Sequence, residues 1–416
     1  MKYELHNADC LEFMRGLPDN HVDAIVTDPP YELGFMGKSW DRSGIANSVE
    51  MWSEALRILK PGGHLLAFSG SRTYHRMTCA IEDAGFEVRD QIMWVYGSGF
   101  PKSHDVSKAI DNAAGAEREV VGETKKCAQT ESTGRYGAWG DGITPTAPAT
   151  DAALQWQGWG TALKPAHEPI CVARKPLEGT VANNVLTWGT GAINVDGCRV
   201  EGVPRTTHAY GNIRGSECFM GGQQIGIVEQ GSSGRWPANL IHDGSDEVLA
   251  GFPESKDGVA GKRAGVAHVT LHGLGALDEP WGGFGGEGSA ARFFYCAKAS
   301  KRDRDEGCEG LEEKNRREDL GNKWTTVDYR DGHNSKVMAR NHHPTVKPTE
   351  LMRYLCRLVT PPNGIVFDPF TGSGSTGKAA VLEGFRFLGC DMTPEYIDIA
   401  RARIEHAINS KPNTLF

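Results

Sequence analysis

Both ends of the chain alternate apolar runs with amphipathic segments, a pattern typical of an α/β layer fold. In residues 1–100, apolar runs predict buried strands at 22–26, 64–68 and 86–96, and helical spacing predicts helices at 49–59 and 73–84. In the last 70 residues the order is helix, strand, glycine-rich loop, helix, strand and a final helix at about 394–408. We therefore expect one doubly wound sheet that is built from both chain ends.

The pattern changes between these ends. Residues 101–163 are rich in Gly, Thr, Ala and Pro, and we interpret them as a long mobile insertion, with a lid as one reading. One buried strand is predicted at 169–173. Residues 177–340 are glycine-rich and weakly periodic, with many Arg, Asn, His and Trp residues. The sequence therefore predicts three parts, at 1–176, 177–340 and 341–416, of which the middle one is inserted.

Composition narrows the class of protein. The 416 residues are 39% hydrophobic and 24% charged, which suits a folded chain with a sizeable core. We expect no membrane span and no signal peptide, because no apolar run is long enough and the first residues lack the pattern. The ten cysteines include no Cys-x-x-Cys pair, which argues against zinc and for free thiols in a reducing cytoplasm. A net charge of −8 gives no overall attraction to DNA, so any positive surface must be local.

A glycine-rich loop follows the predicted strand at 365–367. Such a loop between a buried strand and a helix brings backbone N–H groups close to a ligand. The spacing of Gly372, Gly374 and Gly377 fits the dinucleotide-binding fingerprint, although a glycine loop alone can be an ordinary turn. Asp391 lies 23 residues after Asp368, at the end of the next strand, where a carboxylate can accept from both ribose hydroxyls. Nicotinamide and S-adenosylmethionine enzymes share this spacing, so it predicts an adenosine-type ligand.

Other residues favour S-adenosylmethionine. The Asp368 carboxylate can meet the ammonium of the methionine moiety, and the Phe370 ring suits a sulfonium. Lys347 is predicted to pair with the methionine carboxylate, unless it is an ordinary surface lysine. Asp9 can accept from the adenine amino group of the cofactor or cap the following helix. The predicted cofactor-binding residues are Asp9, Lys347, Asp368, Phe370, Gly372, Ser373, Gly374 and Asp391.

Residues 28–31, which follow the predicted strand at 22–26, read Asp-Pro-Pro-Tyr. The exocyclic amine of adenine is a weak nucleophile, and the Asp28 carboxylate and Pro29 carbonyl can accept hydrogen bonds from its two protons. Consecutive prolines fix φ near −65° and hold these acceptors rigidly, and Tyr31 offers a face on which a base can stack. A lone Asp-Pro-Pro is commonly a turn, but the adjacent tyrosine and the distant glycine loop favour a catalytic role. The predicted catalytic residues are Asp28, Pro29, Pro30 and Tyr31.

These motifs and their order resemble those of the DNA amino-methyltransferases, specifically the circularly permuted β class. The resemblance covers residues 1–100, 164–170 and 340–416. It implies a Rossmann-like methyltransferase sheet, with catalytic, target recognition and cofactor-binding parts at 1–176, 177–340 and 341–416. It also implies S-adenosylmethionine as the cofactor, double-stranded DNA as the partner, a homodimer, no metal and no membrane. The long insertion and the glycine-rich middle resemble those of prophage-type solitary modification enzymes.

The Asp-Pro-Pro-Tyr motif resembles adenine-specific members more than the Ser-Pro-Pro-Tyr of cytosine-N4 members. The expected activity is methyl transfer to N6 of adenine in duplex DNA, by base flipping and direct in-line attack, in the cytoplasm at the nucleoid. Four alternatives stay open at this stage. They are cytosine-N4 methylation, a dinucleotide-dependent oxidoreductase, a DNA-binding regulator on an inactive methyltransferase scaffold, and methylation of RNA or protein.

The middle part is expected to read the DNA sequence and to help extrude the target base. Its basic residues can reach phosphates or guanine edges, and its large aromatic residues can fill the gap that the base leaves. For any single residue, an ordinary surface charge or a core aromatic ring is the more common role. The basic candidates are Arg199, Arg205, Arg214, Arg235, Lys262, Arg263 and Arg292, and the aromatic candidates are Phe219, Trp236 and Trp281.

Overall fold

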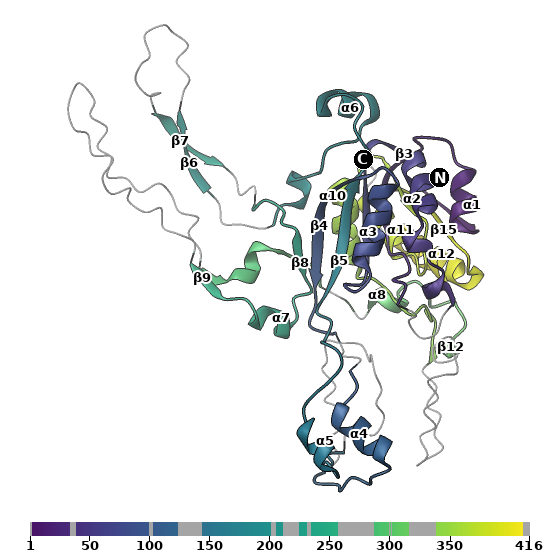
Figure 1. Cartoon of the computed structure of the whole chain (residues 1–416). Helices are drawn as coiled ribbons and strands as arrows, with labels where there is room; N and C mark the ends of the chain where they lie inside the picture. The colour runs from purple at the N-terminus through teal and green to yellow at the C-terminus, as the bar shows by residue number, and fades with distance from the viewer. Residues whose placement is uncertain are drawn as a thin grey trace, which may run out of the picture.

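A nine-stranded mixed sheet forms the centre of the protein (Figure 1). The computed structural model describes residues 2–33, 39–99, 103–123, 144–200, 205–210, 224–230, 234–256, 287–298, 300, 302–315 and 338–410. The strand order is β1-β15-β14-β2-β3-β5-β4-β8-β11. The strands are β1 (Tyr3–Asn7), β2 (Val22–Thr27), β3 (Leu59–Phe68), β4 (Glu87–Val95), β5 (His167–Arg174), β8 (Leu240–His242), β11 (Tyr295–Cys296), β14 (Ile365–Asp368) and β15 (Arg386–Asp391).

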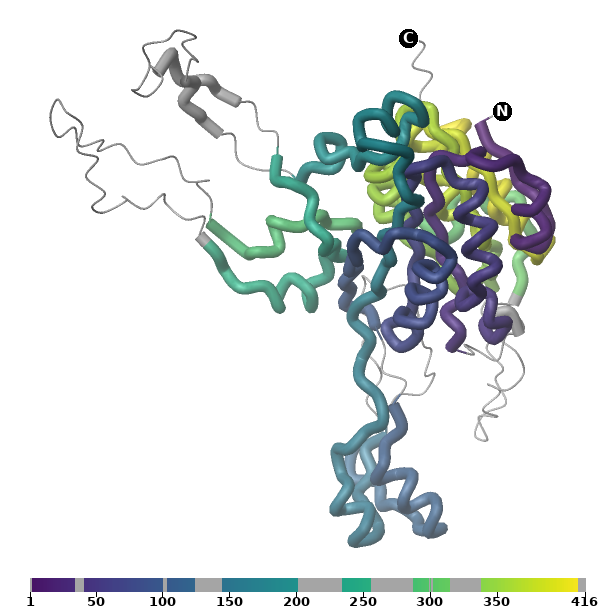
Figure 2. Tube along the Cα trace, turned by 45° about the horizontal axis from the view of Figure 1, so that its top comes forward, coloured from purple at the N-terminus to yellow at the C-terminus, as the bar shows by residue number. Residues whose placement is uncertain are grey.

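The two chain ends interleave in this sheet. β15 pairs in parallel with β1, and β14 pairs in parallel with both β15 and β2. The last two strands of the chain therefore lie between its first two, and the purple and yellow ends of the chain lie together in Figures 1 and 2. The predicted fold class, a doubly wound α/β sheet assembled from both termini, is confirmed.

Helices cover both faces of the sheet because its central strands are apolar on both sides. On β3, Leu66 and Phe68 belong to a buried cluster that includes Leu355 of α10, whereas Leu65 belongs to a second cluster with Trp52 of α2. Successive side chains of a strand point to opposite faces, which explains this division. The helices of the two chain ends are α1 (Cys10–Arg15), α2 (Val49–Ile58), α3 (Tyr74–Asp83), α10 (Thr349–Val359), α11 (Ser375–Glu383) and α12 (Pro394–Asn409).

Residues 101–163 include two helices that the sequence did not predict, and the mobility of this insertion stays a prediction. The described parts, 103–123 and 144–163, contain α4 (Val106–Ala114) and α5 (Asp151–Gln155), which lie away from the sheet at the bottom of Figures 1 and 2. The buried Asp111 carboxylate joins them: it accepts from Arg118, from the backbone N–H groups of Ala149 and Thr150, and from the Thr150 hydroxyl. Polar contacts therefore hold this body together.

Part of the predicted middle domain belongs to the central sheet, because β8 pairs in parallel with β4 and with β11. The limits of the target recognition domain stay a prediction. None of the helices in the described ranges has the length and apolar composition of a membrane span. The remaining elements are η2 (Ser39–Arg42), η3 (Ile45–Asn47), α6 (Val181–Trp188), η4 (Asp196–Cys198), β6 (Arg205–Tyr210), β7 (Gln224–Gln230), α7 (Asp246–Ala250), β9 (Glu254–Lys256), β10 (Glu287–Ser289), η5 (Ala290–Phe293), α8 (Arg302–Asp305), β12 (Lys314–Asn315) and β13 (Met338–Ala339).

Candidate active site

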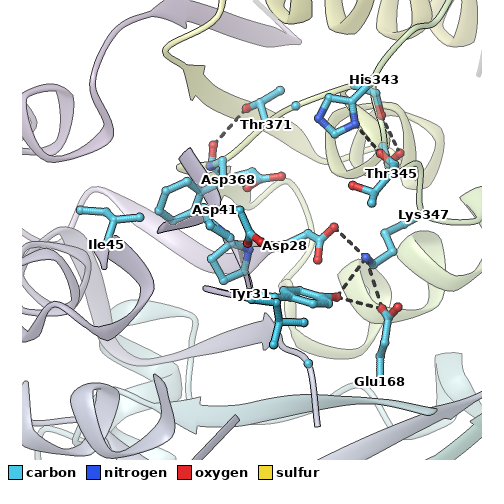
Figure 3. A pocket seen from close by; sticks show the side chains of 18 of the residues that line it. Asp28, Tyr31, Asp41, Ile45, Glu168, His343, Thr345, Lys347, Asp368 and Thr371 are labelled. Carbon is cyan, nitrogen blue, oxygen red and sulfur yellow. Dashed lines mark hydrogen bonds and ion pairs between the residues drawn. The ribbon is translucent and has the colours of Figure 1, made fainter. Parts of the chain in front are cut away.

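The two predicted loops meet in one cavity. β2 and β14 are neighbouring parallel strands, so the loops that follow them leave the sheet at the same edge. The Thr27 hydroxyl donates to Asp368 Oδ1 at 2.7 Å and joins the two strand ends directly. Residues 28–31 and 368–373 line the same cavity of about 1380 Å³ (Figure 3). Segments 340 positions apart in the sequence therefore share one site.

The glycine loop between β14 and α11 is tightly packed. Gly372 and Gly374 have φ values of 48° and 74°, a region that L side chains rarely adopt. A Cβ atom at Gly372 would lie 2.7 Å from His343 Nε2, and one at Gly374 would lie 2.7 Å from the Cα of Ala400. Residues with side chains do not fit at these two positions. The loop therefore presents bare backbone at the cavity, as close binding of a cofactor requires.

Ser373 lies in this loop and is buried at 3% exposure. Its carbonyl accepts from the Arg403 guanidinium at 2.5 Å, and its hydroxyl lies 3.1 Å from the same nitrogen. Arg403, on α12, is fully buried. Ser373 lines the cavity, and Arg403 fixes the loop from behind.

Asp391 ends β15 and also lines the cavity. Its Oδ2 accepts from the Gly372 N–H and its Oδ1 from the Thr393 N–H, both at 2.8 Å. Burial raises the pKa of this carboxyl. Each carboxylate oxygen can accept a second hydrogen bond, so Asp391 can still accept from two ribose hydroxyls.

Asp368 is 2% exposed and lies at the mouth of the glycine loop. Its Oδ1 accepts from Thr27 and, at 3.0 Å, from the backbone N–H of Phe370. Burial raises the pKa of Asp368 to about 6. A cation beside it would favour the ionised form, and both Asp368 and Phe370 line the cavity. The pair fits the ammonium and sulfonium of S-adenosylmethionine.

Asp9 caps α1, because its Oδ1 accepts from the N–H groups of Leu11 and Glu12 at 2.9 and 3.1 Å. The capping role that the sequence left open is thus confirmed. Asp9 also lines the cavity, so a contact with the adenine of the cofactor stays a prediction.

Lys347 lies beside the Asp-Pro-Pro-Tyr loop, where its protein contacts were not predicted. Its ammonium donates to Asp28 Oδ2 at 2.7 Å and to the Tyr31 hydroxyl at 3.1 Å, and it lies 3.3 Å from Glu168 Oε2 (Figure 3). An ammonium has three donors, and these three oxygen atoms occupy them. Lys347 therefore contacts the Asp-Pro-Pro-Tyr loop, and because it also lines the cavity, its pairing with the methionine carboxylate stays a prediction.

The protonation states of Lys347 and Tyr31 depend on burial and on the neighbouring carboxylates. Burial lowers the pKa of Lys347, but Asp28 and Glu168 outweigh this effect and raise it above its usual value. Burial, followed by the same two carboxylates, raises the pKa of Tyr31 well above its usual value. Near neutral pH the cluster therefore holds a charged ammonium and a neutral phenol.

The second carboxylate oxygen of Asp28, Oδ1, is the atom of this cluster that remains available to a ligand. Oδ1 is buried from water and has no hydrogen-bond partner within the described part of the chain. A buried acceptor without a partner is costly, so it marks a place where a ligand donor fits. Pro29 and Pro30 line the cavity beside it.

Glu168 was not predicted as a site residue. Its Oε2 accepts from the Tyr31 hydroxyl at 2.9 Å, and its side chain is 20% exposed. The available signal was a carboxylate directly before the apolar run 169–173 of β5, because such a residue lies at the edge of the sheet.

His343 was also missed. It lines the cavity above Gly372, and its ring contacts Tyr396 edge-on at 4.5 Å. Burial lowers the pKa of His343 to about 3, so the ring is neutral.

The predicted DNA-contacting residues are only partly described. Trp236 is 65% exposed, and the Arg199 guanidinium lies 5.4 Å from its ring centroid. Arg235 and Arg292 lie over the Phe293 ring at 4.8 and 4.4 Å. Of these four predicted residues, none lines the cavity. The side chain of Arg205, and Arg214, Phe219, Lys262, Arg263 and Trp281 as a whole, lie outside the described residues.

The described residues contain no group of three or more His, Cys, Asp or Glu side chains that is placed to hold a metal ion.

A mixed α/β sheet in which the neighbouring parallel strands β2 and β14 end in a carboxylate-bearing loop and a glycine loop is the arrangement expected of a Rossmann-like methyltransferase. The family model N6_N4_Mtase, described as DNA methylase, matches residues 22–187 and 286–402, which is more than half of the chain. The protein belongs to this family of DNA methylases.

Two of the named relatives match over short segments. The type II methyltransferase M2.DpnII of Streptococcus pneumoniae is 44% identical over 63 residues, which are 15% of this chain and 24% of the relative. The DNA adenine methyltransferase YhdJ of Escherichia coli is 38% identical over 66 residues, 16% of this chain and 22% of the relative. The chain thus spans about a quarter of the length of these relatives. The alignment with the solved complex of M1.HpyAVI and SAM covers 97% of this chain and 98% of the M1.HpyAVI chain, at 15% identity and a TM-score of 0.38.

Proposed function

We propose that the protein is a site-specific DNA methyltransferase that moves the methyl group of S-adenosylmethionine to N6 of adenine in duplex DNA. The observation that carries this proposal is the shared cavity of residues 28–31 and 368–373. One loop supplies acceptors for an amine, and the other supplies bare backbone and carboxylates for an adenosine-type cofactor. When bound, S-adenosylmethionine supplies an electrophilic methyl group on its sulfonium.

The half of the cavity around the glycine loop would bind and orient S-adenosylmethionine. Asp391 accepts from the ribose hydroxyls, and Asp368 pairs with the ammonium of the methionine moiety. The Phe370 ring faces the sulfonium, and the N–H groups around Gly372 approach the cofactor from the loop. These residues would hold the cofactor in the part of the cavity next to Asp28 and would exclude water from it.

The target half activates the amine. Asp28 Oδ1 accepts from one proton of the amine, and the Pro29 carbonyl accepts from the other, which raises the electron density on nitrogen. Pro30 keeps the loop rigid, and the base stacks on Tyr31, a contact worth roughly 1–3 kcal/mol. The amine then attacks the methyl group in line. The site holds these acceptors in place beforehand, and this lowers the barrier.

Adenine is the favoured base. The motif is Asp-Pro-Pro-Tyr, and the relative YhdJ is named a DNA adenine methyltransferase. Cytosine N4 is the second candidate, because the family name covers both N6 and N4 methylation. Digestion of the modified DNA and identification of the methylated nucleoside separates the two. Membership of a DNA methylase family argues against a dinucleotide-dependent oxidoreductase, and the assembled cavity argues against an inactive scaffold.

The resemblance to β-class enzymes supports three further parts of the proposal. The protein acts as a homodimer, it reaches DNA in the cytoplasm at the nucleoid, and it requires no metal. Activity that is unchanged by a chelator would support the last point.

Genome-wide mapping of modified bases tests the proposal. A host that lacks the modification is compared with the same host expressing wild type or Asp28→Ala. We expect one short modified motif with wild type and none with Asp28→Ala. The same motif in both strains would refute the catalytic role of Asp28, and no motif with wild type would refute the proposed function.

A further inference from the structure

We infer that Glu168 is a positioning residue for the methyl transfer. It holds Lys347 and Tyr31, so that Asp28 keeps one oxygen bound and the other free for the target amine. It also leaves this side of the cavity with a net negative charge. The inference rests on the proposed function and adds a residue to it.

Four side chains from three separate segments make this cluster. Asp28 and Tyr31 follow β2, Glu168 lies on β5, and Lys347 precedes α10. The Tyr31 hydroxyl bridges the cluster, because it accepts from Lys347 at 3.1 Å and donates to Glu168 at 2.9 Å. The side chains of Lys347, Glu168 and Asp28 are 8%, 20% and 21% exposed. Figure 3 shows the Lys347 ammonium between the two carboxylates.

Glu168 thereby fixes which oxygen of Asp28 is available. Lys347 donates to Oδ2 at 2.7 Å, and Oδ1 stays without a partner in the described structure. Without the Glu168 carboxylate, Lys347 loses its second anionic neighbour and is free to draw closer to both oxygens of Asp28. The acceptor for the target amine would then be occupied.

The charge count gives Glu168 a second effect. Two carboxylates and one ammonium leave a net charge of −1, whereas Asp28 and Lys347 alone cancel. During transfer the S–CH₃ bond breaks and the N–CH₃ bond forms, so the positive charge moves from sulfur to the attacking nitrogen. That nitrogen then releases a proton to Asp28 Oδ1, from which it passes to water. A net negative charge beside the nitrogen favours each of these changes, most strongly in a site that excludes water.

The test compares Glu168→Gln with wild type in steady-state methyl transfer to unmodified DNA. Glu168→Gln keeps the shape of the side chain and removes its charge. Since preorganised electrostatic groups each contribute about 100- to 1000-fold and Glu168 acts through its neighbours, we expect kcat to fall about 10- to 100-fold. The KM for DNA, the affinity for S-adenosylmethionine and the melting temperature should stay close to wild type. Glu168→Asp, which keeps the charge, should recover part of the rate.

The chain offers a matched control on the same pair of strands. Glu87 forms an ion pair with Arg174 at 2.6 Å, and this pair lies at the opposite end of the β4–β5 ladder from Glu168. Glu87→Gln removes the same charge from the same sheet, away from the cavity, and should keep the wild-type kcat.

A double variant separates charge from stability. Glu168→Gln together with Lys347→Gln restores the net charge of −1 on Asp28, so the double variant should lose less activity than the losses of Glu168→Gln and Lys347→Gln alone combine to give. Additive losses would contradict the charge argument, even if each variant is less stable than wild type.

The outcomes distinguish the two proposals. If wild type transfers no methyl group to DNA, the proposed function fails and the inference fails with it. If wild type is active and Glu168→Gln matches Glu87→Gln in kcat, the inference alone is wrong. A defect of Glu168→Gln that is confined to the KM for DNA would also overturn it, because Glu168 would then only shape the base pocket.

Discussion

Two glycines flank α11, and the same substitution should have different effects at the two positions. Gly374 precedes the helix and Gly384 follows it, and both have left-handed φ values, 74° and 92°. Alanine at either position costs roughly 1–2 kcal/mol in backbone strain. The cost in backbone strain is therefore the same at both positions, and only their surroundings differ.

The surroundings set the expected difference. A Cβ at Gly374 would lie 2.7 Å from the Cα and 2.8 Å from the Cβ of Ala400, whereas a Cβ at Gly384 meets no atom within 4 Å. Ala400 is fully buried on α12, so it cannot move aside easily, and overpacking of this kind costs a further 1–3 kcal/mol or so. We expect Gly374→Ala to lower the free energy of unfolding by roughly 2–5 kcal/mol and Gly384→Ala by roughly 1–2 kcal/mol.

The same two variants should also differ in their affinity for the cofactor. Gly372 and Ser373, next to Gly374, line the cavity, so a shift of the loop should weaken S-adenosylmethionine binding by about tenfold or more, equal to roughly 1.4 kcal/mol. Gly384→Ala should bind the cofactor as wild type does. Urea unfolding and titration calorimetry measure the two quantities. Equal destabilisation of both variants, with unchanged affinity in Gly374→Ala, would refute the packing argument.

Four further predictions concern the carboxylates of Asp368, Asp391 and Asp111. Burial raises the pKa of Asp368 from 3.8 to about 6, so the folded protein holds this proton more tightly than the unfolded chain, and stability falls as pH rises through this range. Asp368→Asn should thus raise the free energy of unfolding at pH 8, by up to about 3 kcal/mol, while it weakens cofactor binding; a less stable variant at pH 8 would contradict this. In wild type, cofactor affinity should decrease as pH falls through about 6, because the protonated carboxyl no longer attracts an ammonium, and calorimetry at pH 5 and 7.5 tests this sign. Asp391→Asn should weaken cofactor binding about 10-fold or more, since hydrogen bonds to charged groups contribute about 1.5–3 kcal/mol; an unchanged dissociation constant would remove Asp391 from the site. Asp111→Ala should speed hydrogen exchange in α4 and α5 and leave the central sheet protected, and uniform exchange across both would contradict the separate body described above.

The fold was largely predictable because its central strands are apolar on both faces. Runs such as 22–26 and 365–367 leave few alternatives to buried parallel strands. The pairing of β14 with β2 could also be expected, since a carboxylate-bearing loop follows each strand and ligand sites in such sheets gather at one edge. The α4–α5 body was not predicted, because its two helices are joined through the polar contacts of Asp111, which the local sequence does not show.

The site was predictable where a backbone constraint shows in the sequence. Gly372 and Gly374 occupy positions that only glycine fits, and the two prolines after Asp28 mark a rigid loop. The ion pairs of Lys347 with Asp28 and Glu168 were not predicted, because the sequence neighbours of Lys347 do not show which charges surround it. Its position depends on Glu168, which comes from a strand 179 positions earlier. Only tertiary structure brings these two charges together.

Transfer of an isotopically labelled methyl group tests the central claim most directly. Purified protein is incubated with S-adenosylmethionine labelled at its methyl group and with unmodified duplex DNA, and the digested nucleosides are analysed by mass spectrometry. We expect labelled N6-methyladenine with wild type and no labelled nucleoside with Asp28→Ala. Label in N4-methylcytosine would correct the base alone. The absence of any labelled nucleoside with wild type, or equal label with Asp28→Ala, would contradict the claim that the two chain ends build one methyl-transfer site.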